Sequence, residues 1–258
     1  MKLLIGCPIY KRSWILPLWI RGIITQSLDM SNIGFVFETA PDDESTIASL
    51  EAWKKYDKNI PYFNIKIRED IPHFEHQENG RQWTVSRYEN MTSLRNSLLN
   101  TVKEVEPDYY FSLDSDILLE NQSTIELLIA HIKDGADAVS PLMFMTPHNI
   151  LYPSVMSWRS ENDSMAYRKD SYPLGTYFQS DVIMAAKMMS KKVYSNTEYS
   201  IHNQGEDVGW SLNCRKNQYK LFCASYIYCP HIMNQHMLSD YLKTGDDRKL
   251  ALENYSKL

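Results

Sequence analysis

The stretch Tyr-Tyr-Phe-Ser-Leu-Asp-Ser-Asp-Ile-Leu-Leu, residues 109–119, decides the fold that we predict for this chain. It begins as an apolar run of strand length and leads into two carboxylates, Asp114 and Asp116, which are separated by Ser115. Alternate strand residues point to the same side, so both carboxylates can converge on one point just past the strand's carboxyl end. In α/β sheets, ligands bind at this edge.

Two carboxylates aimed at one point repel each other unless a cation lies between them. Hard oxygen ligands of this kind suit Mg²⁺ or Mn²⁺ carrying a phosphate-bearing substrate. Asp114 and Asp116 therefore predict a divalent metal site. The alternative is a solvated turn after a strand, because a lone Asp-x-Asp is a weak signal.

Strand and helix patterns alternate along the first part of the chain. Strands are expected over residues 2–7, 33–37, 62–67, 109–113 and 136–144, and helices over 13–26, 45–56, 87–105 and 123–133. Ser13 is the expected cap of the first helix, and Asp42 or Asp43 that of the second. This alternation predicts an α/β protein with a mostly parallel sheet flanked by helices.

Composition shifts near residue 146, which predicts a second region with a different role. We expect strands over 179–186 and 224–231, a helix opening at Glu206 and a helical tail over 238–258. The whole chain, 1–258, is expected to form one domain. Its two parts would be 1–145 and 146–258, and the second would carry the tail.

The composition excludes several classes of protein. The 258 residues, 43% of them hydrophobic, suffice for one α/β domain or two small ones. A net charge of -5 and a pI of about 5.8 give no overall basic signature for nucleic acid. Glycines number only 9, and no Gly-rich phosphate-loop motif occurs.

The cysteines and the N-terminus indicate the cellular compartment in which we expect the protein. Cys7, Cys214, Cys223 and Cys229 form no C-x-x-C pair, so we expect reduced, mostly buried thiols. The apolar start of the chain is interrupted at Pro8, and no run reaches membrane-spanning length. These features predict a soluble cytoplasmic protein.

Polar residues follow the other predicted strands. Pro8, Tyr10 and Arg12 come after the first strand and are placed to meet a base or a phosphate, although a plain loop explains them equally well. Glu38 ends the second strand and opens an acidic cluster that can bond a ribose or base. Arg95 lies on the helix before the acidic strand, where it is either an exposed helix charge or a bidentate donor that reaches phosphates.

The second half adds acids and histidines. Glu206 and Asp207 open a predicted helix, where acids also serve as partners of the helix dipole. His231 follows a Tyr-rich strand and can complete a metal site, although a structural role is the commoner explanation. His73 and His76 lie in a long loop and are more simply surface residues.

Basic residues are frequent in this half. If they gather on one face, an anionic acceptor such as nucleic acid or a charged glycan is possible, but a solvated surface is favoured. They are Lys187, Lys191, Lys192, Arg215, Lys216 and Lys220.

Taken together and in order, these motifs resemble those of nucleotide-sugar glycosyltransferases of the GT-A fold, of the family-2-like type with an Asp-x-Asp motif. The matching motifs are Pro8-Ile9-Tyr10, Arg95-Asn96, Asp114-Ser115-Asp116, Gly205-Glu206-Asp207 and Pro230-His231. They extend over most of the chain, and their order makes the combination moderately specific. The resemblance implies metal-dependent transfer of a hexose from a UDP- or GDP-sugar, most often UDP, to an acceptor hydroxyl.

The resemblance also implies roles for single residues. Asp116 would be the principal ligand of Mn²⁺ or Mg²⁺, with His231 as a further ligand, and Asp114 would contact the ribose or sugar directly or through the metal. Pro8, Tyr10, Arg12, Glu38, Arg95 and Ser115 would lie on the donor side. Residues 1–145 would form the half that binds the nucleotide sugar and 146–258 the half that binds the acceptor, with Glu206 and Asp207 as the acceptor-side acids. In an inverting enzyme a carboxylate such as Asp207, with a raised pKa, would act as base; in a retaining enzyme both would orient the acceptor.

The chain departs from the commonest inverting pattern in two places. Its second strand ends in Glu38-Thr39-Ala40 instead of Asp-x-Ser, and no Gln-x-x-Arg-Trp stretch follows the acceptor-side acids. These departures leave the nucleobase contact open and argue against polymer synthesis. The alternatives are a nucleotidyltransferase acting on a sugar phosphate and a non-catalytic sugar-binding domain of the same fold.

Overall fold

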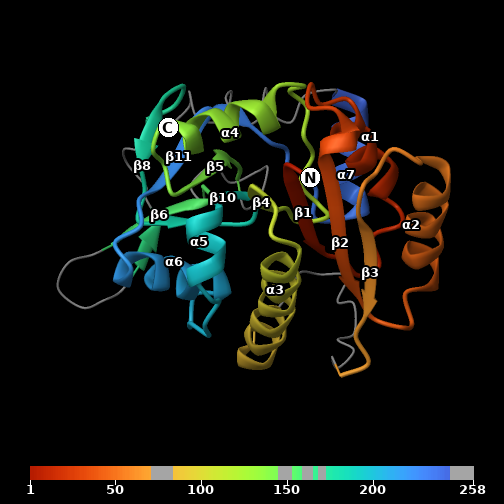
Figure 1. Cartoon of the computed structure of the whole chain (residues 1–258), viewed down its shortest axis with the longest axis horizontal. Helices are drawn as coiled ribbons and strands as arrows, with labels where there is room; N and C mark the ends of the chain where they lie inside the picture. Colours follow the sequence, from red (N-terminus) through yellow and green to blue (C-terminus); the bar gives the residue numbers. More distant parts are fainter. Residues whose placement is uncertain (71–83, 145–152, 159–164, 168–172, 245–258) are drawn as a thin grey trace.

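An eight-stranded sheet with the order β3-β2-β1-β4-β10-β5-β11-β8 forms the centre of the protein (Figure 1). The structure is a computed structural model, and it describes residues 1–70, 84–144, 153–158, 165–167 and 173–244. The strands of the sheet are β1 (Leu3–Pro8), β2 (Ile33–Thr39), β3 (Phe63–Ile67), β4 (Tyr109–Ser112), β5 (Ala138–Leu142), β8 (Tyr177–Gln179), β10 (Lys187–Ser190) and β11 (Leu221–Tyr228).

Most neighbouring strands of this sheet are parallel. The pairs β1–β2, β2–β3, β1–β4 and β5–β11 run parallel, whereas β10 and β8 run antiparallel to their neighbours. The predicted α/β class with a mostly parallel sheet is therefore confirmed. A second sheet has the order β7-β6-β9, from β6 (Val155–Trp158), β7 (Met165–Tyr167) and β9 (Val182–Ile183).

Helices cover both faces of the large sheet. They are α1 (Leu16–Ile24), α2 (Glu44–Tyr56), α3 (Val85–Val105), α4 (Thr124–Lys133), α5 (Lys191–Asn196), α6 (Glu206–Lys216) and α7 (Gln235–Thr244), with a 3-10 turn, η1 (Met30–Asn32). Buried side chains of α1, α2, α4 and α7 share one hydrophobic cluster, and those of α3, α5 and α6 share another. No helix within the described residues is both long and apolar enough to span a bilayer.

The strands form because their sequences are apolar on both sides. In β1, Leu3 and Ile5 pack into the first cluster and Leu4 into the second, and all three are fully buried. Parallel strands covered by helices on both faces require such continuous apolar runs. The four cysteines are free and buried, as expected for reduced thiols.

The predicted cap of α1 is wrong, whereas that of α2 is right in position. Ser13 does not cap α1, because that helix begins at Leu16 with Ile15 as its N-cap and a proline in the first turn. Asp43 occupies the N-cap of α2 but makes no capping hydrogen bond. Its carboxylate accepts a hydrogen bond from the backbone N–H of Lys11 at 2.5 Å instead, so it ties α2 to the loop after β1.

Strands from both predicted halves interleave in the large sheet. β10 comes late in the chain, yet it lies between β4 and β5. Part of the predicted tail, residues 245–258, lies outside the described residues, and α7 covers its beginning.

The packing of α6 yields a prediction about Gly209. A Cβ at this position would lie 1.9 Å from the carbonyl oxygen of Ser200. In an open helix, Gly→Ala stabilises by about 1 kcal/mol. Here we expect Gly209→Ala to lower the free energy of unfolding by about 2 kcal/mol, because backbone must move. Urea denaturation measures this, and an unchanged or raised stability would contradict the packing described.

Candidate functional site

Backbone pairing after the end of β4 brings together residues of the candidate site that are far apart in the sequence. β4 ends at Ser112, so Asp114 and Asp116 follow its carboxyl end. The Nε1 of Trp19 donates a hydrogen bond to the carbonyl of Asp114 at 3.1 Å and fixes this loop from α1. Ile117 forms an antiparallel bridge with His231, which explains why a residue so distant in sequence reaches Asp116.

Asp116 lies between a cation and a histidine. The Nη2 of Arg12 is 2.9 Å from its Oδ2, and the Nε2 of His231 is 3.5 Å from its Oδ1. Arg12 also donates to the carbonyl of Met233, at 3.2 Å. The Nδ1 of His231 is 3.2 Å from the carbonyl of Phe144, which turns Nε2 toward the carboxylate. We call Arg12, Asp116 and His231 the Asp116 cluster.

The Asp116 cluster keeps its carboxylate ionised. Burial would raise the pKa of Asp116, but the charges of Arg12 and His231 outweigh burial and hold this pKa well below its usual range. Burial would lower the pKa of His231, but Asp116 outweighs that effect and raises it. An ionised carboxylate is the kind of oxygen ligand that Mg²⁺ and Mn²⁺ prefer.

A second group of charges surrounds Arg95, which α3 projects into the protein with 1% of its surface exposed. Its Nη2 is 2.7 Å from Oδ1 of Asp114, and its Nε is 3.5 Å from Oε1 of Glu206. Its Nη1 donates to Oγ of Ser112 at 3.0 Å. Arg95 therefore joins the acidic loop after β4 to the first turn of α6.

The first turn of α6 presents the two predicted acceptor-side acids. Gly205 precedes it with a φ of +115°, a conformation that favours glycine. Oδ2 of Asp207 accepts from the backbone N–H of Ala185 at 2.9 Å, and its Oδ1 forms an ion pair with Nζ of Lys187. Glu206 instead faces Arg95.

These acids differ in pKa. Burial, together with the charge of Asp207, raises the pKa of Glu206 to about 7, although Arg95 opposes the shift. Burial also acts on Asp207, but Lys187 and Arg95 outweigh it and lower its pKa. The expectation of a raised pKa for Asp207 is wrong, because a buried lysine that the sequence analysis placed on the surface lies against it.

Lys187 is the residue that the sequence analysis misplaced. It was grouped with surface lysines, but on β10 it is fully buried. A sequence signal exists, because Lys187 interrupts the apolar run Ala185-Ala186-Lys187-Met188-Met189, and a lone charge in such a run requires a partner. Two cations and three carboxylates of this region form what we call the Arg95 cluster. They are Arg95, Lys187, Asp114, Glu206 and Asp207.

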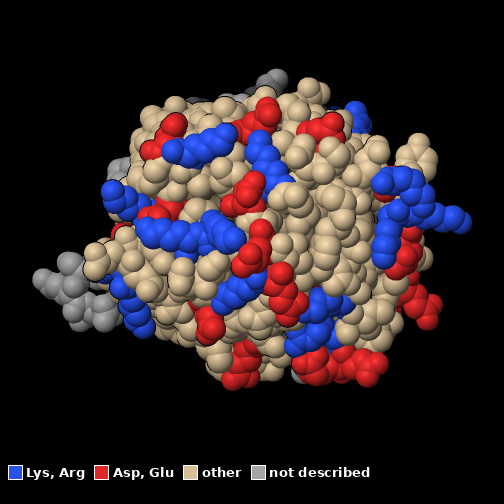
Figure 2. Space-filling model, viewed as in Figure 1, with Lys and Arg blue, Asp and Glu red and all other residues tan. Residues whose placement is uncertain are grey.

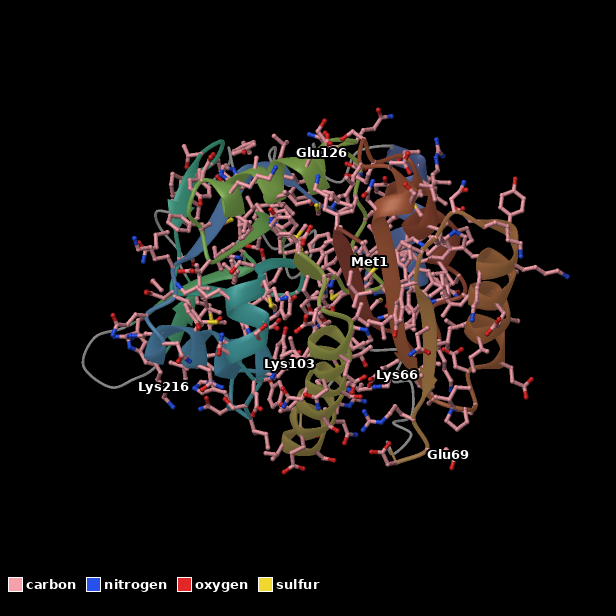
Figure 3. All side chains as sticks on the ribbon, viewed as in Figure 1. Met1, Lys66, Glu69, Lys103, Glu126 and Lys216 are labelled. Carbon is pink, nitrogen blue, oxygen red and sulfur yellow. The ribbon has the colours of Figure 1, made fainter. Side chains whose placement is uncertain are left out.

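The predicted donor-side residues gather at the same sheet edge. Pro8 of β1 lies opposite Glu38 of β2. Glu38 is 1% exposed, and its carboxylate lies 3.0 Å from both the ammonium of Lys66 and the guanidinium of Arg68. Lys66 lies on β3, as Figure 3 shows. The carboxylate of Glu38 is therefore already engaged by two cations.

The remaining donor-side residues flank this edge. The hydroxyl of Tyr10 donates to Asp42 at 2.8 Å near the surface, and Ser115 is buried between the two predicted metal-binding aspartates, with 5% exposed. His73 and His76 lie outside the described residues.

Three of the other basic residues of the second half are engaged by neighbouring acids or by an aromatic ring. Lys191 pairs with Glu106 at 3.4 Å, Lys192 pairs with Asp137 at 3.0 Å, and Arg215 stacks over the ring of Trp158. On the face shown in Figure 2, basic and acidic side chains are interspersed.

The donor set fits a divalent cation that shares its coordination with a ligand. Among the described residues, no three His, Cys, Asp or Glu side chains are grouped as a metal site. Asp116 and His231 approach each other, whereas Asp114 turns to Arg95. Mg²⁺ and Mn²⁺ are commonly held by one or two protein groups together with phosphate oxygens and water, so this pair suffices.

Comparison with known proteins points to one group of enzymes. Residues 2–172 match the family model described as glycosyltransferase family 25, N-terminal domain. Procollagen galactosyltransferase 1-A of Xenopus laevis is 40% identical over 130 residues, which are 50% of this chain and 21% of that protein. The chain thus matches about a fifth of that relative's length.

Solved structures share the fold. GalNAc-T7 with UDP, GalNAc and Mn²⁺ has a TM-score of 0.62 at 10% identity, covering 91% of this chain and 44% of that one. A mannosyltransferase from Pyrobaculum calidifontis, in complex with GDP-Man and Mn²⁺, has a TM-score of 0.59 at 10% identity, covering 91% and 57%. Both similarities concern the GT-A fold alone.

The pKa of Glu206 predicts a pH-dependent stability. The folded value of about 7 lies above that of an exposed glutamate, about 4.3, so folding binds this proton and stability is lost as pH rises through 7. Glu206→Gln removes the ionisation. Relative to the wild type, its free energy of unfolding should rise by about 2 kcal/mol between pH 5 and pH 9.

Denaturation at a series of pH values measures this difference. Glu89→Gln, at an exposed position of α3, is the control and should show no comparable change. The quantity compared is the free energy of unfolding of Glu206→Gln minus that of the wild type. If this quantity stays constant with pH, or falls as pH rises, the environment described is contradicted.

Proposed function

Because this chain belongs to glycosyltransferase family 25, we propose that it transfers a sugar from a nucleotide diphosphate donor to an acceptor hydroxyl with the help of a divalent cation. The observation that carries the proposal is the Asp116 cluster at the carboxyl edge of the sheet, where Asp116 and His231 approach each other. This is the edge at which α/β proteins bind their ligands.

Asp116 and His231 would hold the cation, which would supply a positive charge where the leaving diphosphate develops its negative charge. Arg12 adds a fixed guanidinium beside them, at 2.9 Å from Asp116. Asp114, held by Arg95, would meet the ribose or the sugar. Pro8, Tyr10, Glu38 and Ser115 would border the donor, with the first half of the chain, 1–145, as the donor side of a single domain.

We propose UDP-galactose as the first donor to test and Mn²⁺ as the first metal. The relative in Xenopus laevis is named a procollagen galactosyltransferase, and two proteins of the same fold are described with Mn²⁺. A UDP donor agrees with the implication of the sequence motifs.

On the acceptor side, Glu206 is the better candidate for a base. Its pKa of about 7 lets it take up a proton near neutral pH. Asp207 has both oxygens engaged and a lowered pKa, so it suits a fixed charge that orients its neighbours. In an inverting reaction Glu206 would deprotonate the acceptor hydroxyl; in a retaining reaction both acids would orient it.

The acceptor is proposed only as a hydroxyl of a glycan or another molecule. An anionic acceptor such as nucleic acid is not favoured, because Lys191 and Lys192 are paired with acids and Lys187 is buried. The compartment stays a prediction, and the buried free cysteines favour a reducing one, such as the cytoplasm.

Donor turnover tests the proposed function. The protein is incubated with UDP-galactose, other UDP-sugars and GDP-mannose, with Mn²⁺, Mg²⁺ or chelator, and free nucleotide is measured. We expect metal-dependent release of UDP from one donor. Asp116→Asn should lower its rate by about 100-fold or more, because the ligand for the cation is lost.

Asp134→Asn is the matched control, since Asp134 is exposed at the end of α4 and should leave the rate unchanged. Turnover that withstands both chelator and Asp116→Asn would contradict the metal role. Release of pyrophosphate from UTP and a sugar 1-phosphate, without sugar transfer, would establish the nucleotidyltransferase alternative.

A further inference from the structure

We propose that Lys187 is a positioning residue for the acceptor-side acids, and that it acts by holding Asp207 across the junction of β10 and α6. This inference deepens the proposed function and rests on it. Nothing in the resemblance or in the family match assigns a role to this lysine.

The register of the sheet places Lys187 directly beside the acidic strand. In the antiparallel pair of β10 with β4, Lys187 lies opposite Ser112, two residues before Asp114. Its side chain is fully buried. The ammonium forms an ion pair with Asp207 and lies 5.0 Å and 5.1 Å from the ring centres of Tyr199 and Trp210. Aromatic faces attract a cation at this distance and do not supply its counter-charge.

Asp207 is fixed at both oxygens by one short segment. Oδ1 contacts Lys187, and Oδ2 accepts from the backbone N–H of Ala185 at 2.9 Å. Ala185 has a φ of +55°, a conformation that alanine rarely adopts and that is retained only where the surroundings enforce it. The start of α6 is therefore tethered to residues 185–187 through one carboxylate.

The contacts of Asp207 also fix the position of the neighbouring acid, Glu206. Glu206 and Asp207 are consecutive in the first turn of α6, so fixing Asp207 fixes where the backbone carries Glu206. Arg95, which reaches Glu206 from α3, approaches the same ring of Tyr199 as Lys187, at 5.8 Å. Two buried cations thus hold the first turn from two sides.

If Lys187 served stability alone, an apolar residue at this position would serve as well. Buried ion pairs are frequently no more stabilising than well-packed apolar residues of similar volume, whereas removal of one partner is strongly destabilising. The pair lies beside Asp114 and Glu206, where a fixed charge serves positioning as well as packing. This combination motivates a test that separates the two roles.

The first arm measures turnover. Lys187→Met keeps an unbranched side chain one atom shorter than lysine and removes its charge. With the donor found above, we expect kcat for metal-dependent donor hydrolysis to fall about 10- to 100-fold, with KM for the donor within about threefold of the wild type. Lys191→Met is the matched control, because Lys191 is exposed at the start of α5 and pairs only weakly with Glu106.

The second arm measures thermal unfolding and separates positioning from stability. Lys187→Met should lower Tm by about 10 °C, because it leaves a buried carboxylate without its cation. The double variant Lys187→Met/Asp207→Asn should regain most of this loss, since the uncompensated charge is gone. Only the Tm of this double variant is compared, because Asp207 itself belongs to the proposed acceptor-side acids. If Lys187 served stability alone, the kcat of Lys187→Met, measured well below its Tm, would equal that of Lys191→Met.

Several outcomes would overturn the proposal. Additive Tm changes in the cycle of Lys187→Met and Asp207→Asn would show that the two side chains are not coupled. A kcat for folded Lys187→Met equal to that of Lys191→Met would remove the positioning role. If the wild type itself turns over no nucleotide sugar, the proposed function fails and the positioning role falls with it, while the Tm cycle still reports on the ion pair by itself.

Discussion

The buried guanidinium of Arg95 is the interaction on which the rest of the candidate site depends. It binds Asp114 after β4 and Glu206 at the start of α6, and it hydrogen-bonds Ser112 at the end of the strand. A charge so far from water is tolerated only where carboxylates surround it. Each carboxylate in turn lies against the guanidinium, so the acidic loop, α3 and α6 hold one another in place below the surface.

The site combines two groups of charge with different tasks. In the Asp116 cluster, a carboxylate with a low pKa lies between Arg12 and His231 and is suited to a metal-bound diphosphate. In the Arg95 cluster, Glu206 faces its cation at 3.5 Å and has a pKa of about 7. In the function proposed above, the fixed anion would serve the donor and the titratable acid the acceptor.

The alternation of strands and helices in the first part of the chain and the position of the acidic loop followed from the sequence, because apolar runs buried on both faces and the spacing of Asp114 and Asp116 are local patterns. The burial of Lys187 did not follow, because it depends on the insertion of β10 between β4 and β5, a long-range pairing with no local signature except the apolar run around it. The lowered pKa of Asp207 was missed for the same reason. The predicted cap of α1 was wrong, because the helix begins at Leu16 and Ile15, not Ser13, occupies its N-cap position.

The late position of β10 in the chain has a consequence for folding. β4 and β5 both end before residue 143, yet the strand between them begins only at Lys187. Until that segment has been synthesised, each of these strands presents an unpaired edge, and such edges are templates for aggregation. The centre of the sheet is also closed by contacts of high sequence separation, which form slowly. The chain therefore cannot complete its core strand by strand as it leaves the ribosome, and a fragment ending at residue 172, where the family match ends, would lack the strand that joins the two parts of its sheet.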